Sequence, residues 1–267
     1  MAATEPTTIK IELGQRGDEF LRENNLPQKG SVDRQPAGLT FYEHDWSARN
    51  PGIARVKHGA HSFDIPHALG VTGTEDIERL DVGLESFSVR AGVTAADTIQ
   101  HDEARRLFLD FIQTLTERGW KPAISYNYPR LKGEQAYKYF EEDFAYSVPP
   151  DYRQTLEQWM AMDFAYWRLH AGDVFLNIRI NRDRKRMIPD EPGAYLLALT
   201  LISKEEKAKS HFQGEKDRAN WKNLWVDKIK ELKKERYAKE EALRKRGFDI
   251  DTNYEEPKIH PDDPVEP

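Results

Sequence analysis

The order of strand-like and helix-like segments is the feature that most constrains the fold of this 267-residue chain. Strand-like segments follow one another before the first long helical pattern, at Leu39–Tyr42, Ala54–Lys57, Ser62–Ile65 and Leu80–Arg90. In a parallel α/β fold, strands and helices would instead alternate along the chain. The sequence therefore predicts an α+β fold with a mainly antiparallel sheet, segregated helices and a long charged C-terminal helix.

The longest of these segments, Leu80–Arg90, does not keep its apolar residues on one face. Val82 and Leu84 share one parity, whereas Phe87 and Val89 have the other. Successive residues of a strand point to opposite faces of the sheet. The change of parity predicts a bulge, or a change of buried face, between Leu84 and Phe87.

Asp102–Arg118 carries the clearest helical pattern, because its apolar residues recur at helical spacing. Gly119 can take the left-handed conformation that ends such a helix. A hairpin is predicted around Ala171-Gly172-Asp173. The other predicted elements are a strand at 9–13, helices at 14–25, 133–142 and 151–160, hairpin strands at 164–170 and 174–181, and a strand at 195–202.

The segment Glu215–Arg246 is predicted to be one long helix with twelve Lys/Arg and seven Asp/Glu residues. Its apolar stripe runs from Trp221 to Leu232 only. We therefore expect the first half to pack on the body, and the second half to project or to lie on a partner. After Gly247 the chain is acidic and rich in proline, which predicts an extended arm.

These patterns divide the chain into four parts. We expect a flexible N-terminus at residues 1–8 and an α+β module at 9–149. A second hairpin and helix module is expected at 150–246, with the option that it shares one core with the first. An acidic extended tail is expected at 247–267.

Composition narrows the classes of function. The net charge of −6 argues against a nucleic-acid binder, because phosphate attraction requires a basic surface. The basic residues of the C-terminal helix are interleaved with acidic ones, which favours pairing along a solvated helix over RNA or lipid binding. No apolar run approaches the ~20 residues of a membrane span. The absence of cysteine excludes a disulfide or a thiolate nucleophile.

No motif in the sequence indicates catalysis, a cofactor or a metal. None of the nine serines lies in a G-x-S-x-G motif, and there is no phosphate-binding glycine loop. His58, His61 and His67 suggest a metal site, but if His58 and His61 lie on one strand, they point to opposite faces. A shared ion would need a turn between them, which Gly59 permits. We therefore predict no catalytic residues, no cofactor and no metal ligands.

One group of aromatic and arginine residues has the composition of a binding hot spot, since these types bury large areas at modest entropy cost. Trp159 and Trp167 also suit a core, whereas Tyr126 and Tyr128 are the better surface candidates. We predict that replacing Tyr128 and Arg130 by Ala weakens partner binding and leaves the fold intact. The candidate partner-binding residues are Tyr126, Tyr128, Arg130, Trp159, Tyr166, Trp167 and Arg168.

Three stretches together carry a family resemblance. The first runs from Ile11 to Trp46 (IELGQRGDEFLRENNLPQ…YEHDW), and alone is similar to helix–hairpin modules of bacterial envelope proteins. The second is His101–Phe140, and the third joins LHAGDVFLNIRINRDR to PGAYLLALTL within residues 169–201. As a set they resemble proteobacterial immunity proteins that are encoded beside type VI secretion antibacterial phospholipases.

The resemblance implies a non-enzymatic protein that binds a lipase effector and occludes its active site or blocks its movement. It also implies export to the periplasm, with a lipid anchor in a precursor as an option, and with a cytoplasmic location as the alternative. Three rival functions remain. One is an enzyme on an unfamiliar template, with His101, Asp102 and Arg130 as its polar centre. The second is an adaptor that loads the effector without neutralising it, and the third is a lipid- or RNA-binding module.

Overall fold

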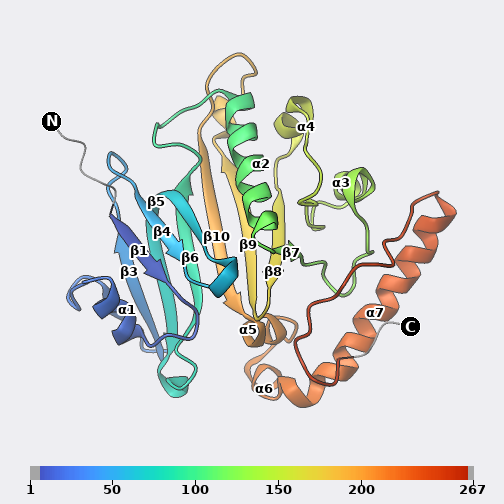
Figure 1. Ribbon diagram of the computed structural model, residues 1–267. Helices are drawn as coiled ribbons and strands as arrows, with labels where there is room; N and C mark the ends of the chain where they lie inside the picture. Colours follow the sequence, from blue (N-terminus) through green and yellow to red (C-terminus); the bar gives the residue numbers. More distant parts are fainter. Residues whose placement is uncertain (1–6, 264–267) are drawn as a thin grey trace.

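The computed structural model describes residues 7–263, and Figure 1 shows their arrangement around one large sheet. Ten strands form this sheet, in the order β1-β4-β5-β6-β10-β9-β8-β7, with β3 pairing with β5 and β2 with β3. The strands are β1 (Thr8–Ile11), β2 (Val32–Arg34), β3 (Leu39–Asp45), β4 (Gly52–Val56), β5 (Phe63–Asp76), β6 (Leu84–Gly92), β7 (Lys121–Pro122), β8 (Tyr166–Ala171), β9 (Val174–Arg182) and β10 (Tyr195–Ser203).

The predicted α+β class is confirmed. The described strand pairs are antiparallel except for β1 with β4. The β6–β10 pair joins a strand from before Pro149 to one from after it, so both halves of the chain contribute to one sheet.

The helices are α1 (Gly17–Glu23), α2 (His101–Glu117), α3 (Gly133–Glu142), α4 (Leu156–Ala161), α5 (Lys204–Lys209), α6 (Glu215–Ala219) and α7 (Trp221–Lys245). The 3-10 turns are η1 (Gly59–His61), η2 (Ile77–Arg79) and η3 (Arg184–Arg186).

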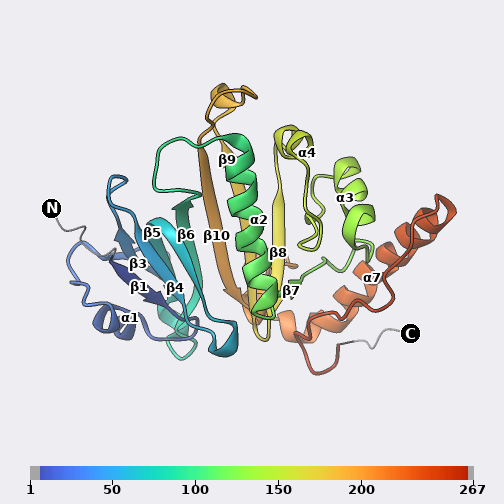
Figure 2. The same ribbon diagram turned by 45° about the horizontal axis from the view of Figure 1, so that its top comes forward.

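The two faces of the β8–β9 region are covered differently. Trp167 points to the face under α2, where its ring lies 4.6 Å from that of Phe108. Phe175 points to the other face and packs in a second, smaller core with Ala208 of α5 and Trp225 of α7. Figures 1 and 2 agree that α2 crosses the sheet, whereas α7 lies beyond the β7 edge.

The predicted irregularity in the long strand segment is present as a β-bulge. Thr74 of β5 pairs with Ser86, but the next residue, Glu75, pairs with Leu84. Glu85 is therefore an extra residue, and both Leu84 and Glu85 are buried. The strand itself begins later than predicted, at Leu84, because a 3-10 turn and a tight turn occupy residues 77–83.

The expectation for the C-terminal helix was wrong in two respects. The helix breaks at Asn220, which separates α6 from α7. The second half of α7 does not project: Lys233, Arg236 and Glu240 are buried, although their charges suggested a solvated face. These side chains form ion pairs there, Glu240 with Arg130 and both Lys233 and Arg236 with Glu256.

The chain after Gly247 returns along α7, as both ribbon views show. It has little regular structure, but Ile259 is buried and Tyr254 packs against the main core. The Tyr254 hydroxyl accepts a hydrogen bond of 2.9 Å from the backbone N–H of Ile124. The predicted flexible N-terminus lies mostly outside the described residues.

Candidate functional site

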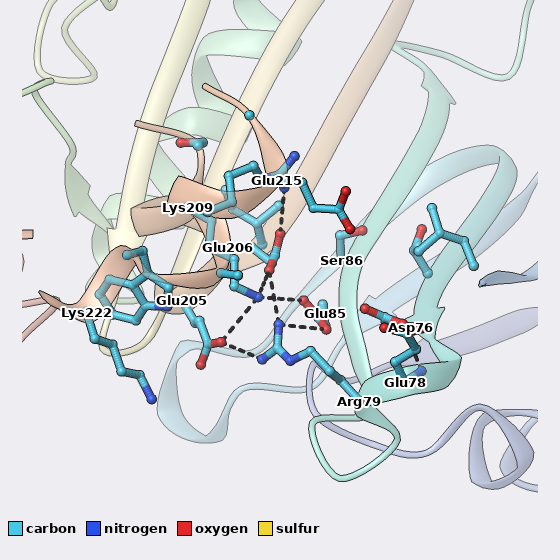
Figure 3. A pocket seen from close by; sticks show the side chains of 18 residues that line it. Asp76, Glu78, Arg79, Glu85, Ser86, Glu205, Glu206, Lys209, Glu215 and Lys222 are labelled. Atoms are coloured by element: carbon cyan, nitrogen blue, oxygen red, sulfur yellow. Dashed lines mark hydrogen bonds and ion pairs between the residues drawn. The ribbon is translucent and has the colours of Figure 1, made fainter. Parts of the chain in front are cut away.

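A recess of about 850 Å³ opens where the β5–β6 connection faces α5, α6 and the start of α7. Figure 3 shows that side chains from these separate parts of the chain point into it. Its charged lining residues are Asp76, Glu78, Arg79, Glu85, Glu205, Glu206, Lys209, Glu215, Arg218 and Lys222.

An ionic network forms the floor of the recess. Arg79 contacts Glu205, and its Nη1 lies 3.4 Å from Glu85 and 3.8 Å from Glu206. Lys209 Nζ lies 2.6 Å from Glu206, 3.2 Å from Glu205 and 3.7 Å from Glu85. Two cations thus join the three carboxyl groups, and the network fastens α5 to the bulged end of β6.

Glu85 reaches this floor because of the bulge, since an extra residue in a strand re-aims the neighbouring side chains. The residue is 8% exposed, and among the described residues its Oε1 accepts no hydrogen bond. Burial, followed by the neighbouring Glu206 carboxyl, raises the pKa of Glu85 to about 8. The raised pKa favours the protonated form of the Glu85 carboxyl at neutral pH, which lowers the negative charge of the network.

The charged groups at the rim of the recess are paired less completely than those of the floor. Asp76 caps η2 by accepting the Glu78 N–H at 2.9 Å. Within residues 7–263, no cation forms an ion pair with Asp76, Glu78 or Glu215, and Glu78 and Glu215 are exposed. The floor is thus neutralised internally. The recess is also lined by two further cations, Arg218, whose Nη2 lies 3.6 Å from Glu206, and Lys222. The three rim carboxylates outnumber these two cations, so the rim keeps a negative balance.

The predicted partner-binding residues lie mostly inside the fold. Tyr126, Arg130, Trp159 and Trp167 are buried. The expectation that Tyr126 lies on the surface was wrong, because its ring packs 5.7 Å from that of Trp225 in the second core. The half-buried members are Tyr128, Tyr166 and Arg168.

Arg130 has a structural partner. Its Nε and Nη2 donate to the two carboxylate oxygens of Glu240 at 2.8 and 2.9 Å, and its backbone N–H donates to Oε1 at 3.0 Å. Glu240 is 0% exposed. Replacing Arg130 by Ala would leave this carboxylate buried without its main cation, so the expectation that the substitution leaves the fold intact is corrected.

The polar centre considered for an enzyme is engaged in three separate contacts. The His101 ring contacts the Tyr195 hydroxyl, and its Nε2 lies 3.0 Å from the carbonyl oxygen of Ile188. Asp102 accepts from Arg105 at 2.6 Å, and Arg130 pairs with Glu240. These contacts do not bring the three residues together as a unit.

The histidines that suggested a metal site also contact the backbone. His58 Nε2 lies 2.8 Å from the carbonyl oxygen of Ala171, and His61 Nδ1 lies 2.6 Å from that of Arg118. Both contacts link the η1 region to segments more than fifty residues away. In the described part of the chain, no group of three or more His, Asp or Glu side chains could hold a metal ion.

Sequence reasoning missed the recess, although two local signals were available. The change of parity predicted the bulge but not that Glu85 would be buried by it. Ser203-x-x-Glu206 has the spacing of a helix start, and the Ser203 hydroxyl does accept the Glu206 N–H at 3.2 Å. Recognising that pattern would have located α5, but not its contact with the β5–β6 connection.

Comparison of the chain with known protein families, curated proteins and solved structures finds no significant match. Across residues 7–263, no helix is both long and apolar enough to cross a membrane.

Proposed function

We propose that the chain is a non-enzymatic immunity protein that binds a cognate antibacterial lipase effector and neutralises it. In this proposal, binding occludes the active site of the lipase or blocks its movement. The complex would form in the periplasm, and the effector would belong to a type VI secretion system. The proposal rests on the family resemblance and on the form of the charged recess.

The single observation that carries most weight is the contrast between the floor and the rim of the recess. The floor is held in place by Arg79 and Lys209, so it is already ordered before any partner arrives. The rim carboxylates Asp76, Glu78 and Glu215 have no such cations in the described chain. A preformed concave site with an acidic rim suits a basic segment of another protein, because complementary charge speeds encounter and selects the partner.

The recess, with a volume of about 850 Å³, can supply one concave part of a protein interface. A stable complex buries roughly 800 Å² on each partner. The recess would hold a central anchor, such as an arginine or lysine side chain, and surrounding exposed surface would supply the rest. Lipase side chains of this type would meet Glu78 and Glu215 first.

Charge reversal of the rim tests this proposal. The double variant Glu78→Lys/Glu215→Lys replaces exposed carboxylates that have no ion-pair partner among the described residues. We expect at least a tenfold loss of affinity for the lipase and a matching loss of inhibition. The control is Asp190→Lys/Glu191→Lys, which makes the same charge change in the exposed β9–β10 loop. Equal affinity of both variants and the wild type would exclude the rim as the binding site.

A second candidate function is favoured by one observation, the adjacent carboxyl groups of Glu85 and Glu206. A carboxyl group with a raised pKa beside an ionised one is a common arrangement for acid–base catalysis. The contacts of Arg79 and Lys209 with both groups argue against it, since they hold the carboxyls as structural partners. Ester or glycoside hydrolysis that is lost in Glu85→Gln would favour the enzyme.

A further inference from the structure

The face of the sheet opposite α2 carries a row of polar residues next to α5. The strand register places Arg168 of β8 directly opposite Asn177 of β9, and His170 directly opposite Phe175. Residues opposite each other in a strand pair point to the same face. These four side chains therefore share one face, and Lys207 of α5 adjoins it, with Nζ 5.9 Å from the Phe175 ring.

Several polar atoms in this group are buried and have no hydrogen-bond partner in the described chain. They are both ring nitrogens of His170 and Oδ1 of Asn177. Nε2 of His211, whose ring lies 5.8 Å from that of Trp225 in the second core, also has no partner in the described chain. His170 is 9% exposed, and its ring lies 5.9 Å from that of Phe175. Buried polar groups without partners are uncommon in folded proteins and require an explanation, such as ordered water, a bound ion or a ligand.

The charges of the group are of one sign. Neither Arg168 nor Lys207 forms an ion pair with a carboxylate within residues 7–263. Burial and then the nearby Arg168 guanidinium lower the pKa of Lys207 to about 8. Burial and then Lys207 and Lys228 lower the pKa of His211 to about 4. Two half-buried cations thus lie near each other without a carboxylate counter-ion in the described chain. Their other neighbours are aromatic faces, Tyr166 at 5.1 Å from Arg168 Cζ and Phe175 at 5.9 Å from Lys207 Nζ.

We propose that Arg168, Lys207 and Asn177 bind a phosphate-type oxyanion on this face of the sheet, with His170 as an additional donor. Arg168 keeps N–H groups for such a ligand, because among the described residues its side chain makes one hydrogen bond, from Nη1 to the Ala145 carbonyl oxygen at 2.9 Å. Guanidinium and ammonium groups are the usual protein ligands of phosphate. The Asn177 amide, rotated so that its NH₂ faces the site, and the imidazole N–H of His170 would complete the donor set.

The bound anion would relieve the repulsion between the two cations and satisfy the buried donors together. Arg168, Lys207 and Asn177 are half-buried, so the site is reachable from solvent. The side chains of this site are different from those that line the acidic recess, although both sites adjoin α5. Its ligand would be the phosphate group of a small molecule or of a phospholipid headgroup.

Titration with inorganic phosphate, followed by calorimetry, tests the site. We expect saturable binding to the full chain, and at least a tenfold weaker Kd for Lys207→Met. The matched control is Lys234→Met, which removes an exposed lysine of α7 that forms no ion pair with a carboxylate among residues 7–263. Because Lys207 has no ion-pair partner to leave unpaired, Lys207→Met should fold; Arg168→Gln provides a second variant with the same expected loss.

A spectroscopic reading separates a local site from general charge attraction. Phosphate should raise the pKa of the Lys207 amine, measured by NMR of ¹³C-labelled lysine, and leave that of Lys234 unchanged. Vesicles of phosphatidylglycerol and of phosphatidylcholine distinguish the sources of the phosphate group. Vesicle binding that is lost in Lys207→Met indicates a lipid headgroup, whereas binding of free phosphate alone indicates a small molecule. Absence of phosphate and vesicle binding, or equal loss in Lys234→Met, would overturn the proposal.

Discussion

Buried charged side chains determine much of the behaviour of this molecule at the scale of single residues. Glu240 is fully buried, and its carboxylate depends on a two-oxygen contact with Arg130. Breaking a buried ion pair leaves an uncompensated charge, which usually costs more than the pair itself contributes. The same reasoning applies to Glu85, whose charge is suppressed by a proton instead of being fully neutralised by a cation.

Arg130→Ala should lower the free energy of unfolding by about 3–5 kcal/mol, because it leaves the Glu240 carboxylate buried without its main partner. Chemical denaturation measures this change. The double variant Arg130→Met/Glu240→Leu removes both charges and should recover most of the loss. A loss below about 1 kcal/mol for the single variant would show that Glu240 is solvated when Arg130 is absent.

Glu85→Gln should remove a pH dependence of stability. The pKa of Glu85 in the folded protein, about 8, lies above the ordinary value of 4.5, so the folded state binds this proton more tightly. The associated stabilisation is fully present below pH 4.5 and is lost as the pH rises through 8.

Thermal unfolding between pH 6 and 9 provides the measurement for this residue. The wild type should lose stability over this range, and Glu85→Gln should lose less. Glu78→Gln, at the exposed rim of the same recess, is the control and should keep the wild-type slope. Identical slopes for all three proteins would show that Glu85 is already ionised in the folded state.

At the scale of elements, the C-terminal segment is held to the body by charges as well as by apolar contacts. Glu256 of the returning chain lies 2.8 Å from Lys233 Nζ and 2.6 Å from Arg236 Nη1. Arg236 also donates from Nε to the carbonyl oxygen of Tyr128 at 2.8 Å. The tail thus neutralises cations on the buried side of α7.

Glu256→Gln should lower the free energy of unfolding by about 3 kcal/mol, since it removes the carboxylate shared by two buried cations. It should also make the segment after Gly247 more sensitive to limited proteolysis. The neighbouring Glu255→Gln is the matched control, because Glu255 is exposed and pairs with Lys121 at the surface. We expect no measurable change there. Equal effects of the two variants would mean that the tail is not docked through Glu256.

The elements that the sequence predicted well are those whose local pattern agrees with their final environment. α2 and α3 were predicted to within one residue at each end, because their apolar faces meet the core directly. β5 was predicted as a short segment at 62–65, but it runs from Phe63 to Asp76, since pairing with β3, β4 and β6 supports residues such as Gly70 and Gly73 in a strand.

The candidate site was less accessible to sequence reasoning for a physical reason. The recess joins residues near position 80 to residues near position 206, and no local pattern encodes that contact. The charged face of α7 was misread as solvated, because its counter-charges lie at Arg130 and Glu256, outside the helix. A hydrophobic pattern identifies apolar burial but not a buried ion pair.

At the scale of the whole molecule, one sheet unites both halves of the chain and carries two charged sites of opposite sign beside α5. The acidic recess lies between the β5–β6 connection and α5. The basic residues Arg168 and Lys207 lie at the face formed by β8 and β9. With a net charge of −6, association with a basic partner should be faster at low salt. Stopped-flow association rates that do not change with salt would argue against electrostatic recognition by the rim.

The most direct test of the proposed immunity function is inhibition at a defined stoichiometry. A lipase captured with the tagged chain from the source cells would be expressed alone and titrated with the pure chain during ester hydrolysis. The proposal predicts that activity falls linearly to zero at one equivalent, and that Glu78→Lys/Glu215→Lys fails to inhibit. A complex that forms while the lipase stays fully active would contradict the proposal and favour the loading adaptor.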